Sequence, residues 1–154
     1  MRFFTDKTAK ASDDYTIIIG CGRLGSKIAN TLSDKGKNVL VMDKSGDSFR
    51  RLSSGFGGLN TIGDGTDIDR LQEAQIANAS TVVAVTDSDN TNILVAQMAK
   101  SLFHVPQVVA RLCDPEKRFV FQEEDIHVVC PSLLSAQEIN SYMNCPVHAA
   151  VGKD

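Results

Sequence analysis

Three glycines, Gly20, Gly22 and Gly25, stand in the spacing G-x-G-x-x-G, and an acid, Asp43, follows 18 residues after the last of them. Glycines at these positions permit a sharp turn, a close approach of a pyrophosphate to the backbone, and tight packing of a helix against a strand. The start of such a helix presents unpaired N–H groups to phosphate, and the later acid can accept hydrogen bonds from a ribose. The spacing therefore predicts a site for an adenine nucleotide.

Side chains beside these residues bear on which nucleotide is bound. Arg23 lies inside the turn, where its guanidinium either reaches a terminal phosphate in bidentate fashion or stays solvated. Leu24 completes the turn and begins the apolar face of the helix that follows. Asp43 disfavours a 2′-phosphate, which makes NADP the less suitable dinucleotide, although Lys44 weakens that exclusion. The choice between NAD(H) and ATP or ADP stays open.

Polar residues after three later strands extend the predicted site. Asp64 lies between two glycines, where it either accepts from an adenine amino group or serves the turn. Thr86 and Asp87 begin a polar run whose members mostly suit turns and caps, while one or two of them could touch ribose or phosphate. Arg111 interrupts an apolar strand, so its charge needs a partner, either a phosphate or a carboxylate such as Asp87. The predicted nucleotide-binding residues are Gly20, Gly22, Arg23, Leu24, Gly25, Asp43, Lys44, Asp64, Thr86, Asp87 and Arg111.

The elements that position these residues follow from an alternation of short apolar runs with amphipathic stretches. Residues 16–19 form a β-branched run, typical of a strand buried on both faces of a parallel sheet. Strands are predicted at 16–19, 38–42, 59–62, 81–86, 107–112 and 126–129. Helices are predicted at 23–35, 47–53, 67–75, 89–102 and 133–143, with a further helix beginning at 114–116. The alternation predicts the α/β class, as a Rossmann-like doubly wound sheet of six parallel strands with helices on both faces.

The length of 154 residues suits one domain and is too short for two of ordinary size. We predict a polar N-terminal tail at 1–14, a nucleotide-binding domain at 15–144 and a C-terminal tail at 145–154. The formal net charge of −3 and the lack of a long basic run argue against nucleic-acid binding. The chain carries no evident secretion signal and no apolar run of membrane-spanning length, so a soluble, cytoplasmic protein is expected.

Catalytic patterns are not evident in the sequence. A dehydrogenase needs a proton donor beside its cofactor, yet the two tyrosines form no Tyr-x-x-x-Lys pair and the three histidines are scattered. Four cysteines, at positions 21, 113, 130 and 145, include no CxxC pair, as expected for reduced thiols. The first three follow predicted strands, and we interpret them as small apolar residues rather than a redox or metal site. The sequence thus predicts a binding domain with no catalytic residues and no metal.

Five short runs, taken together, resemble the TrkA N-terminal domain family, also called RCK or KTN domains, of potassium transporters and channels. These runs are IIGCGRLG at 18–25, VMD at 41–43, GD at 63–64, TDSDNTN at 86–92 and VAR at 109–111. The resemblance covers about residues 15–139, nearly the whole chain. It implies that Arg23 reaches the distal phosphates, Asp43 holds the ribose, Asp64 lies near the base, and Arg111 takes part in phosphate or interface contacts.

The same resemblance implies a role. Members of this family are regulators rather than enzymes; they dimerise or form rings, and they gate a membrane pore by binding NAD(H), ATP or ADP. We therefore predict a cytoplasmic regulatory subunit of a Trk/Ktr-like potassium uptake system, located at the inner face of the membrane through its partner. That partner would be an integral-membrane potassium transporter subunit, and the chain itself would not insert into the membrane.

Two departures from the family pattern matter. Many members continue into a second ligand-sensing subdomain, so we expect it to be absent here or supplied by another polypeptide. Some members also carry a glutamate after the sixth strand that takes part in cation binding, whereas residues 130–133 read CPSL, so no cation site is expected. Two alternative functions stay open: a subunit of an NAD-dependent oxidoreductase with its catalytic residues on a partner chain, and a redox or nucleotide sensor acting on another partner.

Overall fold

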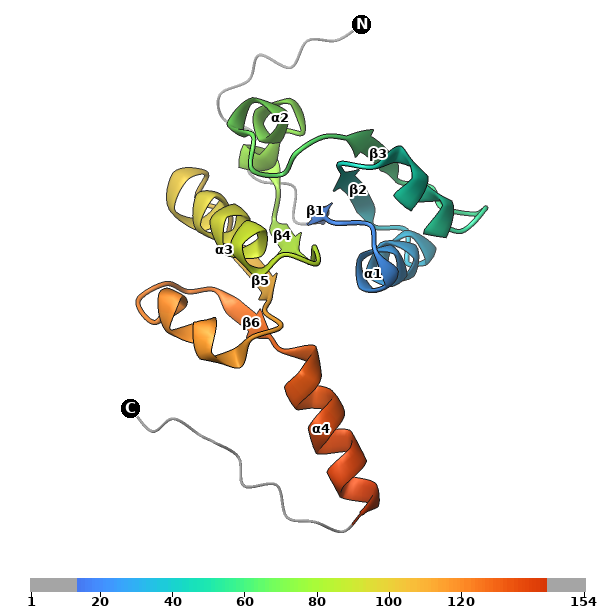
Figure 1. Cartoon of the computed structure of the whole chain (residues 1–154). Helices are drawn as coiled ribbons and strands as arrows, with labels where there is room; N and C mark the ends of the chain where they lie inside the picture. Colours follow the sequence, from blue (N-terminus) through green and yellow to red (C-terminus); the bar gives the residue numbers. More distant parts are fainter. Residues whose placement is uncertain (1–13, 144–154) are drawn as a thin grey trace, which may run out of the picture.

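The computed structural model describes residues 14–143. Within this range six parallel strands form one sheet in the order β3-β2-β1-β4-β5-β6 (Figure 1). The strands are β1 (Tyr15–Ile19), β2 (Asn38–Asp43), β3 (Leu59–Ile62), β4 (Thr81–Ala84), β5 (Gln107–Arg111) and β6 (His127–Val129). The predicted doubly wound sheet of six parallel strands is confirmed.

Four α-helices and four 3₁₀- or π-helical segments accompany the strands in the described range. The α-helices are α1 (Arg23–Asp34), α2 (Ile68–Glu73), α3 (Asp89–Gln97) and α4 (Pro131–Tyr142). The other segments are the 3₁₀ helices η1 (Gly46–Arg51), η2 (Ile76–Asn78) and η4 (Pro115–Phe121) and the π-helical η3 (Met98–Leu102). Because the chain runs outward from β1 to β3 and then returns to β4, the order of the strands reverses between β1 and β4. A ligand crevice is expected at that reversal, outside the carboxyl ends of the strands.

Alternate residues of β1 supply the two faces of the core. Ile17 and Ile19 belong to one buried cluster, together with Leu71 of α2 and Val95 of α3. Ile18 belongs to the other cluster, with Ala29 of α1. Helices therefore cover both faces of the sheet, as the continuous apolar character of residues 16–19 predicted.

Several predicted boundaries are wrong by a few residues, and the geometry of the ends explains the shifts. The final helix begins at Pro131 rather than Leu133, because a proline fits the first helical position. The helix predicted to reach residue 102 remains α-helical only to Gln97 and continues as a π-helical turn. Residues 46–51 form a 3₁₀ helix instead of an α-helix, and the strand ladder of β4 ends at Ala84, before the predicted 86.

The predicted tails, 1–14 and 145–154, lie outside the described residues except for Asp14. The predicted domain span of 15–144 stays a prediction. Asp14 accepts hydrogen bonds from the backbone and side-chain nitrogens of Asn38 at the start of β2. Among residues 14–143, no helix combines the length and apolar content needed to cross a membrane.

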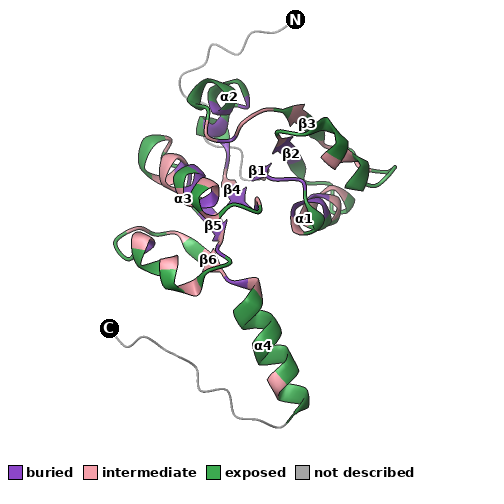
Figure 2. Cartoon of the chain, viewed as in Figure 1, coloured by how far each residue is buried: buried purple, intermediate pink, exposed green. Residues whose placement is uncertain are grey.

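α4 differs from the other three α-helices because none of its residues is buried. α4 extends away from the sheet, and its surface is almost entirely exposed (Figures 1 and 2). Large apolar side chains lie on that surface, with Leu134 and Ile139 more than half exposed and Tyr142 exposed by 80%. A helix in this condition is an unpartnered element of the fold.

Candidate functional site

A crevice of about 730 Å³ opens at the reversal between β1 and β4. It is lined by Ile19, Gly20, Gly22, Arg23, Leu24, Met42, Asp43, Lys44, Ser48, Arg51, Gly63, Gly65, Val85, Thr86, Asp87, Ser88, Thr91, Arg111 and Pro131. Nine of the eleven predicted nucleotide-binding residues are in this set, the exceptions being Gly25 and Asp64. The crevice has the size of a small-molecule site.

The three glycines of the turn have different surroundings. Gly20 has φ +106°, and a Cβ there would approach the backbone nitrogen of Thr86 to 2.9 Å. A Cβ on Gly25 would collide with the carbonyl oxygen of Gly20, so this glycine lets α1 pack against the turn. Gly22 has no protein atom within 4 Å of its Cβ position and faces the crevice. The turn, the close packing and the open space beside the backbone thus belong to separate residues, and the approach of a phosphate to Gly22 stays a prediction.

The N-terminus of α1 is left without a side-chain cap. Its N-cap is Gly22, no side chain of the described residues accepts from its first N–H groups, and its first turn holds no acid. Asp67 caps α2, Ser88 caps α3 and Asp114 caps η4, whereas α4, like α1, has no side-chain cap and no acid in its first turn. Free N–H groups and the positive end of the helix dipole therefore face the crevice at α1, which suits phosphate.

Asp43, at the end of β2, is held in place by two backbone groups. Its Oδ2 accepts from the backbone nitrogen of Cys21 at 2.7 Å, and its Oδ1 accepts from that of Ser45 at 2.8 Å. Each carboxylate oxygen can accept more than one hydrogen bond, so both keep capacity for hydroxyl donors. The carboxylate is thereby fixed against the glycine turn with room to accept from a ribose diol.

The crevice is cationic although the whole chain is acidic. Its lining residues include four cations, Arg23, Lys44, Arg51 and Arg111, and two carboxylates, at positions 43 and 87. The formal net charge of the chain is −3. A positive cleft on an acidic protein concentrates anions at that cleft.

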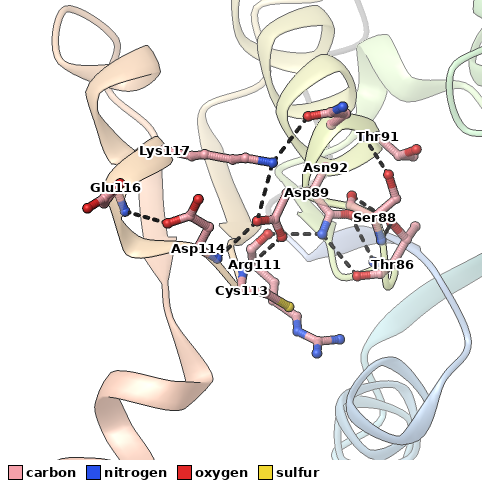
Figure 3. A network of polar contacts seen from close by, with 11 residues as sticks. Thr86, Ser88, Asp89, Thr91, Asn92, Arg111, Cys113, Asp114, Glu116 and Lys117 are labelled. Carbon is pink, nitrogen blue, oxygen red and sulfur yellow. Dashed lines mark hydrogen bonds and ion pairs between the residues drawn. The ribbon is translucent and has the colours of Figure 1, made fainter.

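Arg111 ends β5 and carries one unsatisfied atom. Its Nε is buried, and no partner for it exists among the described residues. The guanidinium points away from the polar contacts around α3 (Figure 3). The predicted alternative partner, Asp87, forms no ion pair with it in residues 14–143. A buried donor without a partner is costly, which favours an anion in the crevice as the partner.

Asp64 is engaged within its own turn. Its Oδ1 accepts from the nitrogen and the hydroxyl of Thr66 at 2.9 and 2.7 Å, and Lys44 pairs with its Oδ2 at 3.3 Å. The hydrogen bonds from Thr66, aided by Lys44, hold the pKa of Asp64 below its ordinary value. Its neighbours Gly63 and Gly65 line the crevice instead. This geometry favours the turn interpretation, and contact with adenine stays a prediction.

Ten lining residues lie outside the predicted set: Ile19, Met42, Ser48, Arg51, Gly63, Gly65, Val85, Ser88, Thr91 and Pro131. Two of them, Ser48 and Arg51, lie on η1, directly after β2, and that position at the carboxyl edge of the sheet was an available signal. Pro131 is the first residue of α4, so the root of the exposed helix forms part of the crevice wall.

The cysteines do not gather in the crevice. Of the three in the described residues, Cys21 and Cys130 are buried, Cys113 is exposed, and none lines the site. Burial, together with the charge of Asp43, raises the pKa of the Cys21 thiol, which disfavours the reactive thiolate. Among residues 14–143, no cluster of three or more histidine, cysteine or acidic side chains is arranged to hold a metal.

Comparison with known proteins places these features in a family. The model of the TrkA-N domain matches residues 16–131. The Trk system potassium uptake protein TrkA of Streptomyces coelicolor is 41% identical over 125 residues, covering 81% of this chain and 56% of the relative. The TrkA homolog of Pyrococcus abyssi is 36% identical over 109 residues, covering 71% and 48%. The chain therefore spans about half the length of these curated relatives.

Solved structures agree on the fold. The structure of GsuK bound to ADP has a TM-score of 0.71 and 25% identity, covering 87% of this chain and 35% of that one. The GsuK channel bound to NAD has a TM-score of 0.72 and 24% identity, covering 86% and 24%. Because the TrkA-N model matches residues 16–131 and the TrkA relatives are 41% and 36% identical, the chain belongs to the TrkA-N domain family.

Proposed function

We propose that this chain is the adenine-nucleotide-binding regulatory domain of a potassium uptake system and is not an enzyme. The observation that carries the proposal is the pairing of an uncapped α1 N-terminus with the fixed carboxylate of Asp43 across one cationic crevice. The free N–H groups suit phosphate and the carboxylate suits a ribose, which are the two parts of an adenine nucleotide with the strongest polar requirements.

The geometry supports a particular orientation of the nucleotide. In this orientation the ribose would lie at Asp43 and the first phosphates would lie over Gly22, where the backbone is open at the start of α1. Arg23 on α1 and Arg111 at the end of β5 approach the crevice from the two sides of the strand reversal. Either guanidinium can bind phosphate oxygens in bidentate fashion, and Arg111 has a buried donor still to satisfy.

The ligand is NAD(H) or ATP/ADP. The relatives are named as Trk potassium uptake proteins, and GsuK has been solved with ADP and with NAD. Asp43 accepts equally well from the adenosine ribose of each candidate, while its charge disfavours the 2′-phosphate of NADP. A nucleotide regulates only if it binds two states of the protein with different affinity, and the phosphate contacts of Arg23 and Arg111 are where ATP and ADP differ.

Family membership and the exposed surface of α4 both support the proposed protein partners. We propose a homodimer or a ring of such dimers at the cytoplasmic face of the membrane, attached to an integral-membrane potassium transporter subunit. The exposed apolar side chains of α4, among them Leu134, Ile139 and Tyr142, support contact with a second protein surface.

The proposed oligomer is tested by Ile139→Asp, which places a charge on that surface. We expect wild-type protein to sediment as a dimer or larger species and the variant to shift toward monomer in analytical ultracentrifugation. Leu59→Asp, which changes an apolar side chain exposed by 69% on the edge strand β3, is the matched control and should leave sedimentation unchanged. Monomeric wild-type protein at all concentrations would contradict this part of the proposal.

The nucleotide site is tested by calorimetry and thermal shift with ATP, ADP, AMP, NAD, NADH and NADPH. A nucleotide at one hundred times its Kd should stabilise the wild type by about 2.7 kcal/mol. Asp43→Ala should abolish that effect, whereas Asp47→Ala, which changes an exposed acid outside the crevice, should preserve it. Binding unaffected by Asp43→Ala would refute the site, and hydride transfer from NADH to a small carbonyl would refute the non-enzymatic role.

A further inference from the structure

A fully buried amide lies directly behind the crevice. Asn92, in the first turns of α3, has 0% of its surface exposed and does not line the crevice. A polar side chain in such a place costs free energy unless all its groups are hydrogen-bonded. The partners of Asn92 therefore indicate what the burial achieves.

Asn92 makes four hydrogen bonds, all to two residues that line the crevice. Its Oδ1 accepts from the backbone nitrogen of Thr86 at 2.9 Å and from the Thr86 hydroxyl at 2.7 Å. Its Nδ2 donates to the carbonyl oxygens of Thr86 at 3.0 Å and Arg111 at 2.9 Å. The amide orientation is fixed by these partners, because an N–H group requires the oxygen and two carbonyls require the NH₂ group. Figure 3 shows this network.

The hydrogen bonds of Asn92 lie where the ladder between β4 and β5 has ended. β4 and β5 pair in register from Thr81↔Gln107 to Ala84↔Ala110, and beyond that pair β4 has no further partner in the ladder. Both Thr86 and Arg111 lie past this point: Thr86 follows the end of β4, while Arg111 is the last residue of β5 and still pairs with Val129 of β6. The side chain of Asn92 connects them and so sets the separation of the two strand ends at the crevice.

The connection extends to the glycine turn. A Cβ on Gly20 would come within 2.9 Å of the Thr86 nitrogen, so the backbones of these two residues are in close contact. Because Thr86 is held from behind by Asn92, its position against Gly20 is fixed as well. The Thr86 hydroxyl donates to Asn92 at 2.7 Å, the shorter of its two donor contacts, the other being the Ser88 carbonyl oxygen at 3.2 Å, and its oxygen accepts from the backbone nitrogen of Ser88 at 3.2 Å.

A second residue of the same helix reinforces the arrangement. Asp89 lies three residues before Asn92, on the same side of α3, and accepts from the backbone nitrogens of Cys113 at 2.8 Å and Asp114 at 3.0 Å. The start of α3 is thus bonded to the chain on both sides of Leu112. Neither Cys113 nor Asp114 lines the crevice, so these contacts of Asp89, unlike those of Asn92, do not reach a crevice-lining residue.

We propose that Asn92 is a positioning residue for nucleotide binding, which holds Thr86 against the glycine turn and holds Arg111 where its guanidinium enters the crevice. The inference rests on the proposed nucleotide site and adds to it a residue that does not touch the ligand. It accounts for an asparagine among the buried residues of α3, the other two being Val95 and Ala96.

The test replaces Asn92 with its closest isostere, Asn92→Asp, and measures the Kd of ADP and NAD by calorimetry from pH 5.5 to 8.5, each against wild type at the same pH. The introduced carboxylate would face two carbonyl oxygens, so the affinity at pH 8.5 should fall about tenfold or more. Burial and those carbonyls raise the pKa of the new carboxyl. On acidification it gains a proton, donates again, and the affinity should recover toward wild type.

The charged groups near Asn92 should not obscure the pH dependence of affinity that the new carboxyl causes. The charged groups in the network are those of Asp89, Arg111, Asp114, Glu116 and Lys117 (Figure 3). The pKa of Asp89 lies below its ordinary value, since the N–H groups of Cys113 and Asp114 outweigh the effect of its burial, so it stays ionised throughout. Asn90→Asp makes the same change on an exposed residue of α3 and should keep wild-type affinity at every pH.

A second pair of variants covers the case in which Asn92→Asp does not fold. Thr86→Val removes the hydroxyl that donates to Asn92, and Thr86→Ser keeps it. We expect a severalfold loss of affinity for Thr86→Val and recovery in Thr86→Ser.

The outcomes separate the two proposals. If wild type binds no nucleotide, the proposed function fails and this inference fails with it. If wild type binds and folded Asn92→Asp binds equally well at all pH values, only the positioning role is refuted, and Asn92 serves stability alone. If Asn92→Asp does not fold, equal affinity of Thr86→Val and wild type refutes the role.

Discussion

Two helices begin at the same edge of the sheet, directly after neighbouring strands, and they treat their first N–H groups in opposite ways. α1 follows β1 and has no side-chain cap and no acid in its first turn. α3 follows β4, is capped by Ser88, and carries Asp89 in its first turn. Under the proposed function, position at a strand's carboxyl end is therefore not sufficient for a phosphate site. The N–H groups must also be left free by the chain itself.

The side chains at the start of α3 hydrogen-bond to neighbouring segments of the chain. Asp89 and Asn92 bond to the chain after β5 and to Thr86, so this helix organises the wall of the crevice. α1 instead packs through Gly25 on the turn and leaves Gly22 open. Under the two proposals, the start of α1 thus serves the ligand and the start of α3 serves the wall of the crevice.

The largest expected effect comes from giving α1 the kind of cap that α3 has. Gly22→Asp places a carboxylate at an N-cap whose extended backbone, φ −78° and ψ −161°, an aspartate can adopt. The stability of the protein should change by only a few tenths of a kcal/mol, and nucleotide affinity should fall about a hundredfold or more because the carboxylate competes with phosphate. Calorimetry and urea unfolding measure the two quantities.

The control for that change is Gly55→Asp, since a Cβ at Gly55 also meets open space and the residue does not line the crevice. It should leave nucleotide affinity unchanged. A Gly22→Asp protein that binds nucleotide as tightly as wild type would show that the α1 terminus is not the phosphate site.

A smaller effect, on stability, is expected at α3. The Asp89 side chain is 9% exposed, and Asp89→Asn places an NH₂ group against one of two backbone N–H donors. We expect a loss of about 1 to 3 kcal/mol in the free energy of unfolding at pH 7, measured by urea titration.

The pH dependence of that loss follows from the lowered pKa of Asp89. The stabilisation is complete above the ordinary aspartate pKa of about 4 and declines as pH falls through the lower pKa of the folded state. The difference in unfolding free energy between wild type and Asp89→Asn should therefore shrink on acidification below about pH 4. A difference that stays constant down to pH 2.5 would contradict this account.

The smallest of the three effects is expected at α2, whose N-cap lies away from the crevice. Asp67 accepts from the nitrogen of Asp69 at 2.9 Å, so Asp67→Ala should cost about 1 kcal/mol of stability. Nucleotide Kd should not change, because Asp67 does not line the site. A change in Kd as large as that of Gly22→Asp would undo the distinction between structural caps and the ligand-binding terminus.

The glycine turn and Asp43 could be predicted because a single strand–turn–helix–strand unit contains all the residues that decide their geometry. The same holds for the strands, whose apolar runs are short and clearly bounded. The place of Ser48 and Arg51 directly after β2 was a signal, but which side chains of η1 reach the crevice depends on how that segment folds, and residue types alone do not decide this. The π-helical turn after Gln97 likewise carries no signal in residue types.

Asn92 lies between these cases. In the sequence it ends a run of polar residues, and its burial is decided by tertiary packing. A signal was present, however, since Asn92 falls on the helical periodicity of Val95, Ala96 and Ala99, all of which are fully buried. A polar residue in register with an apolar helix face should be examined for buried hydrogen bonds.

Pro131 belongs both to the wall of the crevice and to the first turn of α4. With 12 residues and a rise of about 1.5 Å each, α4 extends about 18 Å from that wall. None of its residues is buried, so its direction is set mainly at its root. A tilt of about 10° at Pro131 would displace Tyr142 by about 3 Å. The pivot of α4 therefore lies in the crevice wall. A small rotation there produces a larger displacement at the C-terminal end of the helix.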